Sequence, residues 1–400
     1  MNHDTVVIGA GLAGLTAALR LAEEGRQVLL VAKGVGSTHL APATIDVLAV
    51  DGESSAEALA KLPPEHPYSR LGVELVAASI EWLKARVPGY HGGLDENFLL
   101  PTAVGAAKAS AVVPESMAGG DLRGGGRFLF VGLGLKDFYP TYLAENLDQI
   151  ADVSARAIEL TPPRGPDGSL GLARGFDQPD FREALARELK GQLEPDERVG
   201  FPAVLGLGRA GEVWRDLEQR LERPVFEVAT LPPSLPGMRL YEAMTEALRK
   251  AGGRTLIGPT VLGAETSNRR VEGVVVEQAA RPTTLRARSF VLASGGFASG
   301  GLQLDSHGRI REALFDLPVA GAPDGPRFLP TYLEEQPLDR VGVAVDERLR
   351  PTDADGKPKY ENLYAAGATL AGAAPWREGS GNGLSLATGY AAAAILEGEQ

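Results

Sequence analysis

The stretch Asp4-Thr5-Val6-Val7-Ile8-Gly9-Ala10-Gly11-Leu12-Ala13-Gly14-Leu15 decides the fold of this chain. Its apolar run, Thr5 to Ile8, is typical of a buried parallel strand. The residues from 12 to 24 predict a helix, because Leu12, Leu15, Leu19 and Ala22 share one face. Gly25 suits a helix C-terminus, and the apolar residues 28–31 predict a second strand. The stretch therefore predicts a β-α-β unit of about thirty residues.

The three glycines of this turn have the spacing GxGxxG. In that motif the first glycine permits the tight turn, the second lets a pyrophosphate approach the backbone, and the third lets helix and strand pack closely. The helix N-terminus adds free N–H groups and the positive end of its dipole. Because strands flank the motif on both sides, we expect a bound dinucleotide rather than a plain tight turn. The predicted cofactor contacts here are Gly9, Ala10, Gly11, Leu12, Ala13 and Gly14.

The second strand does not end in the usual acid. An Asp or Glu there would hold the ribose hydroxyls, but this chain has Ala32 followed by Lys33. Two alternatives follow: FAD held in a different way, or FMN in a decayed site. The small-residue loop after the strand suits close contact with a flat cofactor, through Gly34, Ser37 and Thr38. His39 in the same loop could lie near a flavin ring or carry it covalently, or could simply bond the backbone.

Composition excludes several functional classes. The 400 residues are 44% hydrophobic and 23% charged, which predicts a globular protein of one large or two smaller α/β domains. The net charge of −12 argues against nucleic-acid binding. The chain has no cysteine, so thiolate metal ligands, cysteine-bound iron–sulfur clusters and cysteine nucleophiles are excluded, and we expect no metal site. No apolar stretch has the length of a membrane span, and the first strand begins at once, so we expect a soluble cytosolic protein.

Two further glycine turns follow predicted strands late in the chain. A buried strand over 289–292 leads into Ala293, Ser294, Gly295 and Gly296, and a strand at 363–366 leads into Gly367. A third glycine-rich turn opens a helix of small residues that runs to Leu396. Its residues are Gly381, Asn382, Gly383, Leu384 and Ser385, and its N-terminal N–H groups would face an anion or a flavin oxygen.

These motifs predict an α/β protein with a Rossmann-like FAD-binding fold, a parallel sheet with a β-meander, and an inserted α+β domain. The flavin-binding parts are 1–50, 231–300 and 341–400, with a short irregular insertion at 301–340. The inserted domain, 51–230, is expected to face substrate or a partner.

The motifs together resemble the flavoprotein superfamily of succinate dehydrogenase and fumarate reductase. A narrower resemblance, to the B subunit of anaerobic glycerol-3-phosphate dehydrogenase, spans essentially the whole chain. It is carried by residues 35–48, 231–240, 289–302 and 362–388.

The narrower resemblance implies oxidation of sn-glycerol 3-phosphate to dihydroxyacetone phosphate, with electrons passed towards quinone. It implies two partners, the catalytic flavoprotein or A subunit and the membrane-anchoring iron–sulfur protein or C subunit. The chain would then be cytoplasmic and indirectly associated with the inner face of the membrane. The motif favours FAD, whereas the family is associated with FMN.

Oxidising a secondary alcohol with a flavin also needs a general base and a cation for the substrate phosphate. His39 and His307 are the candidate bases, and Arg377 is the candidate phosphate ligand, with Arg309 and Arg311 as further candidates in the insertion. Each of these could instead be an ordinary surface or backbone-bonding residue. Two other functions stay open: a non-catalytic assembly protein with a relic nucleotide fold, and a stand-alone flavin dehydrogenase or reductase.

Overall fold

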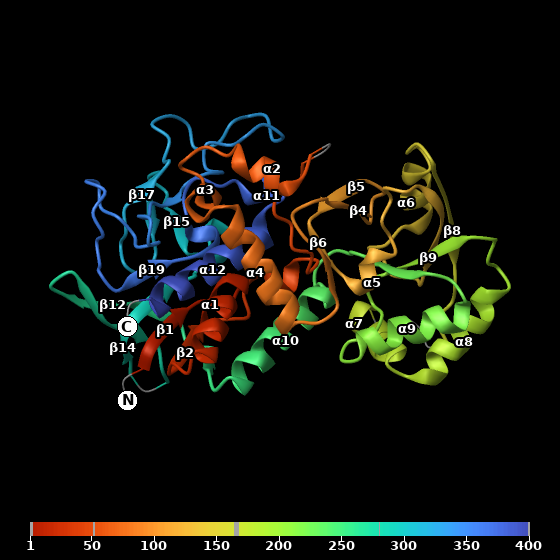
Figure 1. Ribbon diagram of the computed structural model, residues 1–400, viewed down its shortest axis with the longest axis horizontal. Coiled ribbons are helices and arrows are strands. Elements are labelled where there is room, and N and C mark those ends of the chain that lie inside the picture. Colours follow the sequence, from red (N-terminus) through yellow and green to blue (C-terminus); the bar gives the residue numbers. More distant parts are fainter. Residues whose placement is uncertain (1–2, 51–52, 164–167, 280, 399–400) are drawn as a thin grey trace. The chain divides into compact units, whose positions relative to one another are not determined.

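The computed structural model describes residues 3–50, 53–163, 168–279 and 281–398. The chain forms two compact units (Figure 1). Unit 1 contains residues 1–38, 56–86 and 241–400, and unit 2 contains residues 39–55 and 87–240. The boundary in the later part of the chain falls within one helix, α10 (Leu235–Lys250).

Unit 1 is built on a seven-stranded sheet. Its parallel strands occur in the order β11 (Arg254–Ile257), β2 (Val28–Ala32), β1 (His3–Ile8), β14 (Thr283–Leu292) and β19 (Leu363–Ala365). In register, Val6 of the central strand lies between Leu29 and Phe290, and all three are buried. Apolar side chains on both faces suit a strand that is covered on both sides. The predicted Rossmann-like class is thus confirmed.

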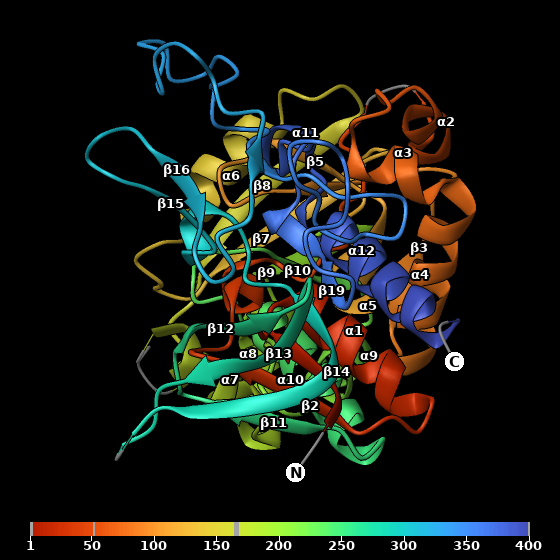
Figure 2. The same cartoon turned by 90° about the vertical axis from the view of Figure 1, so that its left-hand side faces the viewer.

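The β-meander of unit 1 branches from the same sheet. Figure 2 shows β12 (Val261–Ser267), β13 (Arg270–Val276) and β14 side by side, and these pairs are antiparallel. The strand predicted to begin at residue 289 is the second half of β14, which starts at Thr283 and stops at Leu292. The first half of β14 pairs with β13, while its second half lies between β1 and β19. Along β14 the residues change from alternating polar and apolar to continuously apolar. This change marks the point where the neighbouring strands change, and the strand itself continues through it.

Helices α1 (Leu12–Glu23) and α12 (Gly381–Glu397) pack directly against each other in unit 1 (Figure 1). Small residues make this approach possible. A Cβ on Gly389 would lie 2.3 Å from the carbonyl oxygen of Ala13, so only glycine fits there. Arg20 joins the same helices farther along, because its guanidinium donates to both carboxylate oxygens of Glu397 at 2.8 Å.

The domain boundaries differ from the predicted ones. The sequence pattern assigns residues 56–86 to the insert, but they belong to unit 1. The reason is α4 (Val73–Arg86), whose Trp82 ring lies 6.0 Å from the ring of Tyr390 in α12 and whose indole N–H donates to Glu23. Residues 39–50 belong to unit 2, where Ile45 exchanges backbone hydrogen bonds with Val112.

The remaining elements of unit 1 are short. Helix α2 (Ser55–Ala60) belongs to unit 1 except for its first residue, Ser55, which is assigned to unit 2. The predicted irregular insertion contains a hairpin and one strand of a second pair. The short elements of unit 1 as a whole, inside and outside this insertion, are α3 (Pro67–Leu71), β15 (Leu302–Leu304), β16 (Ile310–Glu312), β17 (Val319–Ala320), β18 (Gly342–Val343) and α11 (Pro375–Glu378). None of the described helices combines the length and apolar character that a membrane crossing requires.

Unit 2 has a four-stranded parallel sheet with the order β10 (Val225–Val228), β9 (Glu197–Pro202), β7 (Gly126–Gly132) and β8 (Val153–Glu159). Two small antiparallel pairs accompany it, β3 (Tyr90–Gly92) with β6 (Val112–Pro114) and β4 (Phe98–Pro101) with β5 (Ala107–Ser110). Its helices are α5 (Glu115–Ala118), α6 (Pro140–Leu147), α7 (Gly168–Phe176), α8 (Pro179–Lys190) and α9 (Ala210–Leu221).

The core of unit 2 centres on Phe226. Its ring meets Phe128 and Phe130 edge to face, with centroids 6.0 and 5.8 Å away. Glycines leave the room for it: a Cβ on Gly120 or on Gly200 would lie 2.6 Å from the ring. A buried ion pair lies nearby in sequence, where Glu227 accepts two hydrogen bonds from Arg239, at 2.7 and 3.0 Å.

Replacement of Gly200 by alanine should destabilise the protein, because the new methyl group overpacks the Phe226 and Phe130 rings. We expect a loss of about 1–3 kcal/mol in the free energy of unfolding, measured by urea denaturation. Gly191→Ala is the matched control, since no described atom lies within 4 Å of its Cβ position and its φ is −73°. Equal urea midpoints for the two variants would contradict this account of the core.

Candidate functional site

The glycine turn after β1 is held by backbone contacts. The N–H of Gly9 donates to the carbonyl of Val31 at 2.9 Å, and Gly9 has a φ of +116°. A Cβ on Gly9 would lie 2.1 Å from the carbonyl oxygen of Ala293, and one on Gly14 would lie 2.0 Å from that of Gly9. Neither position can hold a side chain, because the backbones of β1, α1 and the β14 loop already touch there.

Gly11 is different. Apart from its own chain neighbours, no described atom lies within 4 Å of the place a Cβ would take. Gly11 caps α1 without a side-chain hydrogen bond, and the first turn of α1 has no acidic residue. The protein itself therefore does not require a glycine here, and the space beside the helix N-terminus suits an anionic group that approaches the backbone.

The loop after β2 closes onto this turn. Gly36, with a φ of +72°, lies so close that a Cβ there would be 2.8 Å from both N and Cα of Gly11. Ala32 is buried, whereas Lys33 and Gly34 are exposed, and this strand end supplies no carboxylate. Ser37 and Thr38 form a short 3-10 turn.

The loop after β14 meets the loop after β19. The N–H of Ala293 donates to Ile8 and that of Ala366 donates to Leu292, so the ends of three neighbouring strands are linked. Gly295 has a φ of +78°, and a Cβ on Gly296 would lie 2.9 Å from the carbonyl oxygen of Ala368.

Helix α12 joins the same region through Gly367. The N–H of Gly367 donates to the hydroxyl of Thr388 at 2.8 Å, and a Cβ on Gly367 would meet Ala13 at 2.9 Å. The predicted residues Gly381, Asn382, Gly383, Leu384 and Ser385 open α12, whose first turn has no acidic residue. Unit 1 thus brings the predicted cofactor residues to one edge of its sheet, where the parallel strands end.

Three hydroxyl groups mark the inside of this edge, which we call the cradle. In the part of the chain that the structure describes, the side-chain oxygens of Thr38, Ser294 and Thr369 are shielded from solvent without a hydrogen-bond partner. Buried hydroxyls normally have partners. A cofactor with a pyrophosphate and a polyhydroxyl chain would provide them, so the cradle fits a flavin nucleotide. Thr369 is the residue that sequence reasoning missed, and its only signal was a hydroxyl shortly after the turn at Gly367.

The predicted catalytic residues are not gathered in this way. His39 belongs to unit 2, where its carbonyl accepts the N–H of Ser234 at 2.8 Å. His307 is exposed in the turn between β15 and β16, and Asp305 accepts its backbone N–H. Arg377 donates through Nε to Asp339 at 2.6 Å and through Nη1 to the carbonyl of Leu333 at 2.8 Å, whereas its Nη2 is buried without a hydrogen-bond partner among the described residues.

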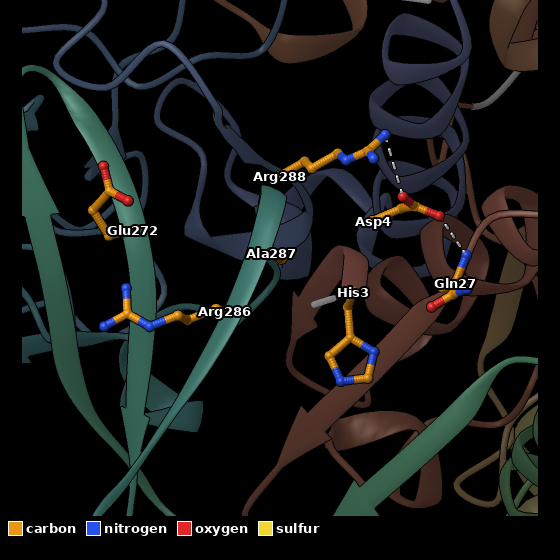
Figure 3. A pocket seen from close by; sticks show the side chains of 7 residues that line it. All are labelled: His3, Asp4, Gln27, Glu272, Arg286, Ala287 and Arg288. Carbon is orange, nitrogen blue, oxygen red and sulfur yellow. Dashed lines mark hydrogen bonds and ion pairs between the residues drawn. The ribbon is translucent and has the colours of Figure 1, made fainter. Parts of the chain in front are cut away.

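Figure 3 shows a pocket of unit 1 away from the cradle. It lies where β1 begins and along the first half of β14, lined by His3, Asp4, Gln27, Glu272, Arg286, Ala287 and Arg288. Arg286 pairs with Glu265 at 2.7 Å and Arg288 lies 3.7 Å from Asp4, so both cations face carboxylates. Ligands of open α/β sheets bind at the opposite, carboxyl ends of the strands, so we do not assign the cofactor here. No group of described His, Asp and Glu residues is arranged to hold a metal ion.

Comparison with known proteins agrees with the geometry. Residues 4–384 match the family model described as FAD binding domain. The chain is 34% identical to the probable B subunit of anaerobic glycerol-3-phosphate dehydrogenase from Halobacterium salinarum, covering 98% of this chain and 97% of that protein. It is 33% identical to the B subunit from Pectobacterium atrosepticum, with 96% of each covered, and 31% identical to that from Vibrio cholerae, with 98% and 95% covered.

Among solved structures, the 3-ketosteroid Δ1-dehydrogenase of Sterolibacterium denitrificans is similar over the full length of both chains, with 11% identity and a TM-score of 0.49. That likeness is too distant to inform the function. The family model and the curated relatives, in contrast, each match nearly the whole chain. This chain is therefore a flavoprotein with an FAD binding domain, and it belongs to the family formed by the B subunit of anaerobic glycerol-3-phosphate dehydrogenase.

Proposed function

We propose that this flavin oxidoreductase takes part, within a multi-subunit enzyme, in the oxidation of sn-glycerol 3-phosphate to dihydroxyacetone phosphate. The observation that supports the proposal is the 31–34% identity, over nearly the full length, to relatives that carry this name. The cradle of unit 1 supports the cofactor part of it, through the open space at Gly11 and the unpartnered hydroxyls.

The reaction moves a hydride from C2 of the substrate and a proton from the hydroxyl on that carbon. A bound flavin supplies the hydride acceptor. The chain supplies N–H groups at the starts of α1 and α12, and both first turns lack acidic side chains, so neither competes with an anionic cofactor. His39, which follows Thr38 directly in the chain, is the candidate base.

The partners are part of the proposal. The names of the relatives indicate a multi-subunit enzyme. Without a cysteine the chain has no ligands for a cysteine-bound iron–sulfur cluster, so electrons would leave through a partner's metal centre. We propose the catalytic flavoprotein (the A subunit) and the iron–sulfur protein (the C subunit) as these partners. The iron–sulfur protein would link the complex to the inner face of the membrane and to quinone.

The purified protein should be yellow, with the absorption bands of oxidised flavin. After acid precipitation, chromatography of the supernatant against FAD and FMN standards identifies the cofactor. The FAD-binding family predicts FAD. FMN is the alternative, because Ala32 stands where an acid would bind the ribose hydroxyls of a dinucleotide. Colour that stays in the pellet would indicate covalent attachment, for which His39 is the candidate. A colourless protein that takes up neither nucleotide would refute the flavin assignment.

Replacement of Gly11 by valine should weaken flavin binding and leave the fold intact. The side chain would enter open space rather than protein, and the φ of −73° at Gly11 is allowed for valine. We expect the dissociation constant for FAD to rise by about tenfold or more, which equals about 1.4 kcal/mol, when apoprotein is titrated by flavin fluorescence. Gly325→Val, also in unit 1 with an open Cβ position, is the control. Equal affinities in both variants would contradict the cradle at Gly11.

Turnover separates the functional alternatives. Anaerobic oxidation of sn-glycerol 3-phosphate with a dye acceptor is measured for this chain alone, for the catalytic flavoprotein partner alone and for both together. Activity that requires a flavin-loaded form of this chain supports the proposal. Full activity of the complex with the flavin-free apoprotein of this chain would show an assembly protein with a relic fold. Activity only towards other substrates would show a stand-alone flavin enzyme.

A further inference from the structure

A partly buried charged cluster lies just before the start of α12 in unit 1, with buried His66 and Glu378 and a more exposed Arg340. Its centre is Glu378, the last residue of α11, whose side chain is 12% exposed. One carboxylate oxygen accepts from Arg340 at 2.6 Å. The other accepts from His66 and from the hydroxyl of Ser380, both at 3.2 Å. The cradle and the candidate catalytic residues include none of these four residues.

The hydrogen bonds define which groups in the cluster donate and which accept. His66 is fully buried, and its Nδ1 accepts the backbone N–H of Tyr68 at 3.1 Å. The ring proton of the neutral imidazole therefore lies on Nε2, which donates to Glu378. Burial alone would raise the pKa of Glu378, but hydrogen bonds from His66, the Ala374 backbone and Arg340 hold this pKa below its ordinary value. Both carboxylate oxygens are thus fixed acceptors.

This cluster joins three separate segments of unit 1 at one turn. His66 precedes α3, and Arg340 precedes β18 and also donates to the carbonyl of Gly372 at 2.9 Å. Gly372 in turn lies so close to residue 65 that a Cβ would be 2.4 Å from the Glu65 carbonyl oxygen. The segment 372–380 is therefore clamped from two sides.

The clamped segment leads straight into the first turn of α12. Gly379 has a φ of +58°, and Ser380, fully buried, is the N-cap whose carbonyl accepts the N–H of Leu384 at 2.8 Å. Between Glu378 and the first helical residue, Gly381, there are only these two residues. A displacement of Glu378 would thus be transmitted to the N–H groups at the start of α12.

We propose that Glu378, held by His66 and Arg340, is a positioning residue that sets where the N-terminus of α12 meets the flavin. The proposal rests on the flavin site at this helix start. It assigns a role to a pair of residues, His66 and Glu378, that lie 312 positions apart in the sequence. Glu378 touches neither substrate nor cofactor in this proposal, and acts through Ser380 and the helix start.

The substitution Glu378→Gln tests this directly. An amide has only one acceptor oxygen, so its NH₂ group would face either Arg340 or the His66 and Ser380 donors. The matched control is Glu335→Gln, because Glu335 pairs with the same Arg340 at 2.6 Å but is about half exposed. Its amide oxygen can keep the hydrogen bond to Arg340.

The readouts are the dissociation constant of apoprotein for FAD, the visible spectrum of the loaded protein and the urea midpoint of the apoprotein. We expect Glu378→Gln to weaken FAD binding by about tenfold or more and to shift the flavin bands, while Glu335→Gln matches the parent. His66→Leu, which removes the ring donor, should resemble Glu378→Gln, and His66→Gln, which can still donate, should recover part of the affinity.

A Glu378→Gln protein with parental FAD affinity and an unchanged spectrum would overturn the proposal, and a lowered urea midpoint in it would then show a purely structural role. If Glu378→Gln is not recovered folded, the pair His66→Leu and His66→Gln decides by the same criteria. A parent protein that binds no FAD would instead refute the flavin site itself, so the two failures are distinguishable.

Discussion

Backbone-to-backbone contact at glycines is the constraint on which unit 1 depends. The turn at Gly9 touches the β14 loop, α1 touches that turn at Gly14, and α12 touches α1 at Gly389, each at a distance that excludes a Cβ. Where an added methyl group meets side chains, rotamer changes and small shifts can accommodate it at a cost of about 1–3 kcal/mol. Here the obstacle on the other side is main chain that belongs to the central strands and helices. These contacts fix how the β1 turn, the β14 loop, α1 and α12 lie against one another.

The sheet edge formed by these contacts lacks acidic side chains at the starts of α1 and α12, as an anion-binding site requires. The start of α1 lies there, with its Ala13 against Gly389 of α12, and neither helix has an acid in its first turn. The whole chain carries a net charge of −12, yet these two turns contribute nothing to it. The charged cluster at Glu378 is neutralised by Arg340 and lies just before the start of α12. In the proposed function, a nucleotide would therefore be bound mainly by neutral N–H and hydroxyl groups, which orient an anion without forming an ion pair.

The sequence predicts the strand-to-glycine turns at this edge because their signals are local. A strand, a glycine turn and a helix are adjacent in the chain at Gly9, and the turns at Gly295 and Gly367 repeat the strand-to-glycine pattern. Parallel strands then bring such turns together without further information. Thr369 was missed, since a single hydroxyl has no pattern until its burial is known.

Non-local features could not be predicted in this way. The pattern of α4 shows that one face is buried but not which unit buries it, so residues 56–86 were assigned to the wrong unit. Arg377 was chosen for its position before a flavin turn, yet its partner, Asp339, lies in a segment that gave no regular pattern. Pairs such as His66 and Glu378 depend on the folded path of the chain, and no spacing rule connects them.

The discontinuous make-up of unit 1 has a consequence for how the protein is made. Strands β1 and β2 leave the ribosome long before β14, with which β1 pairs on its other side, His3 opposite Ala287. At a synthesis rate of about 5–20 residues per second, that partner arrives on the order of tens of seconds later. Most of unit 2 is one continuous stretch, 87–240, that emerges in between. Unit 2 can thus fold while the early β-α-β unit still has an unpaired strand edge, a state open to incorrect pairing and one that a chaperone would protect.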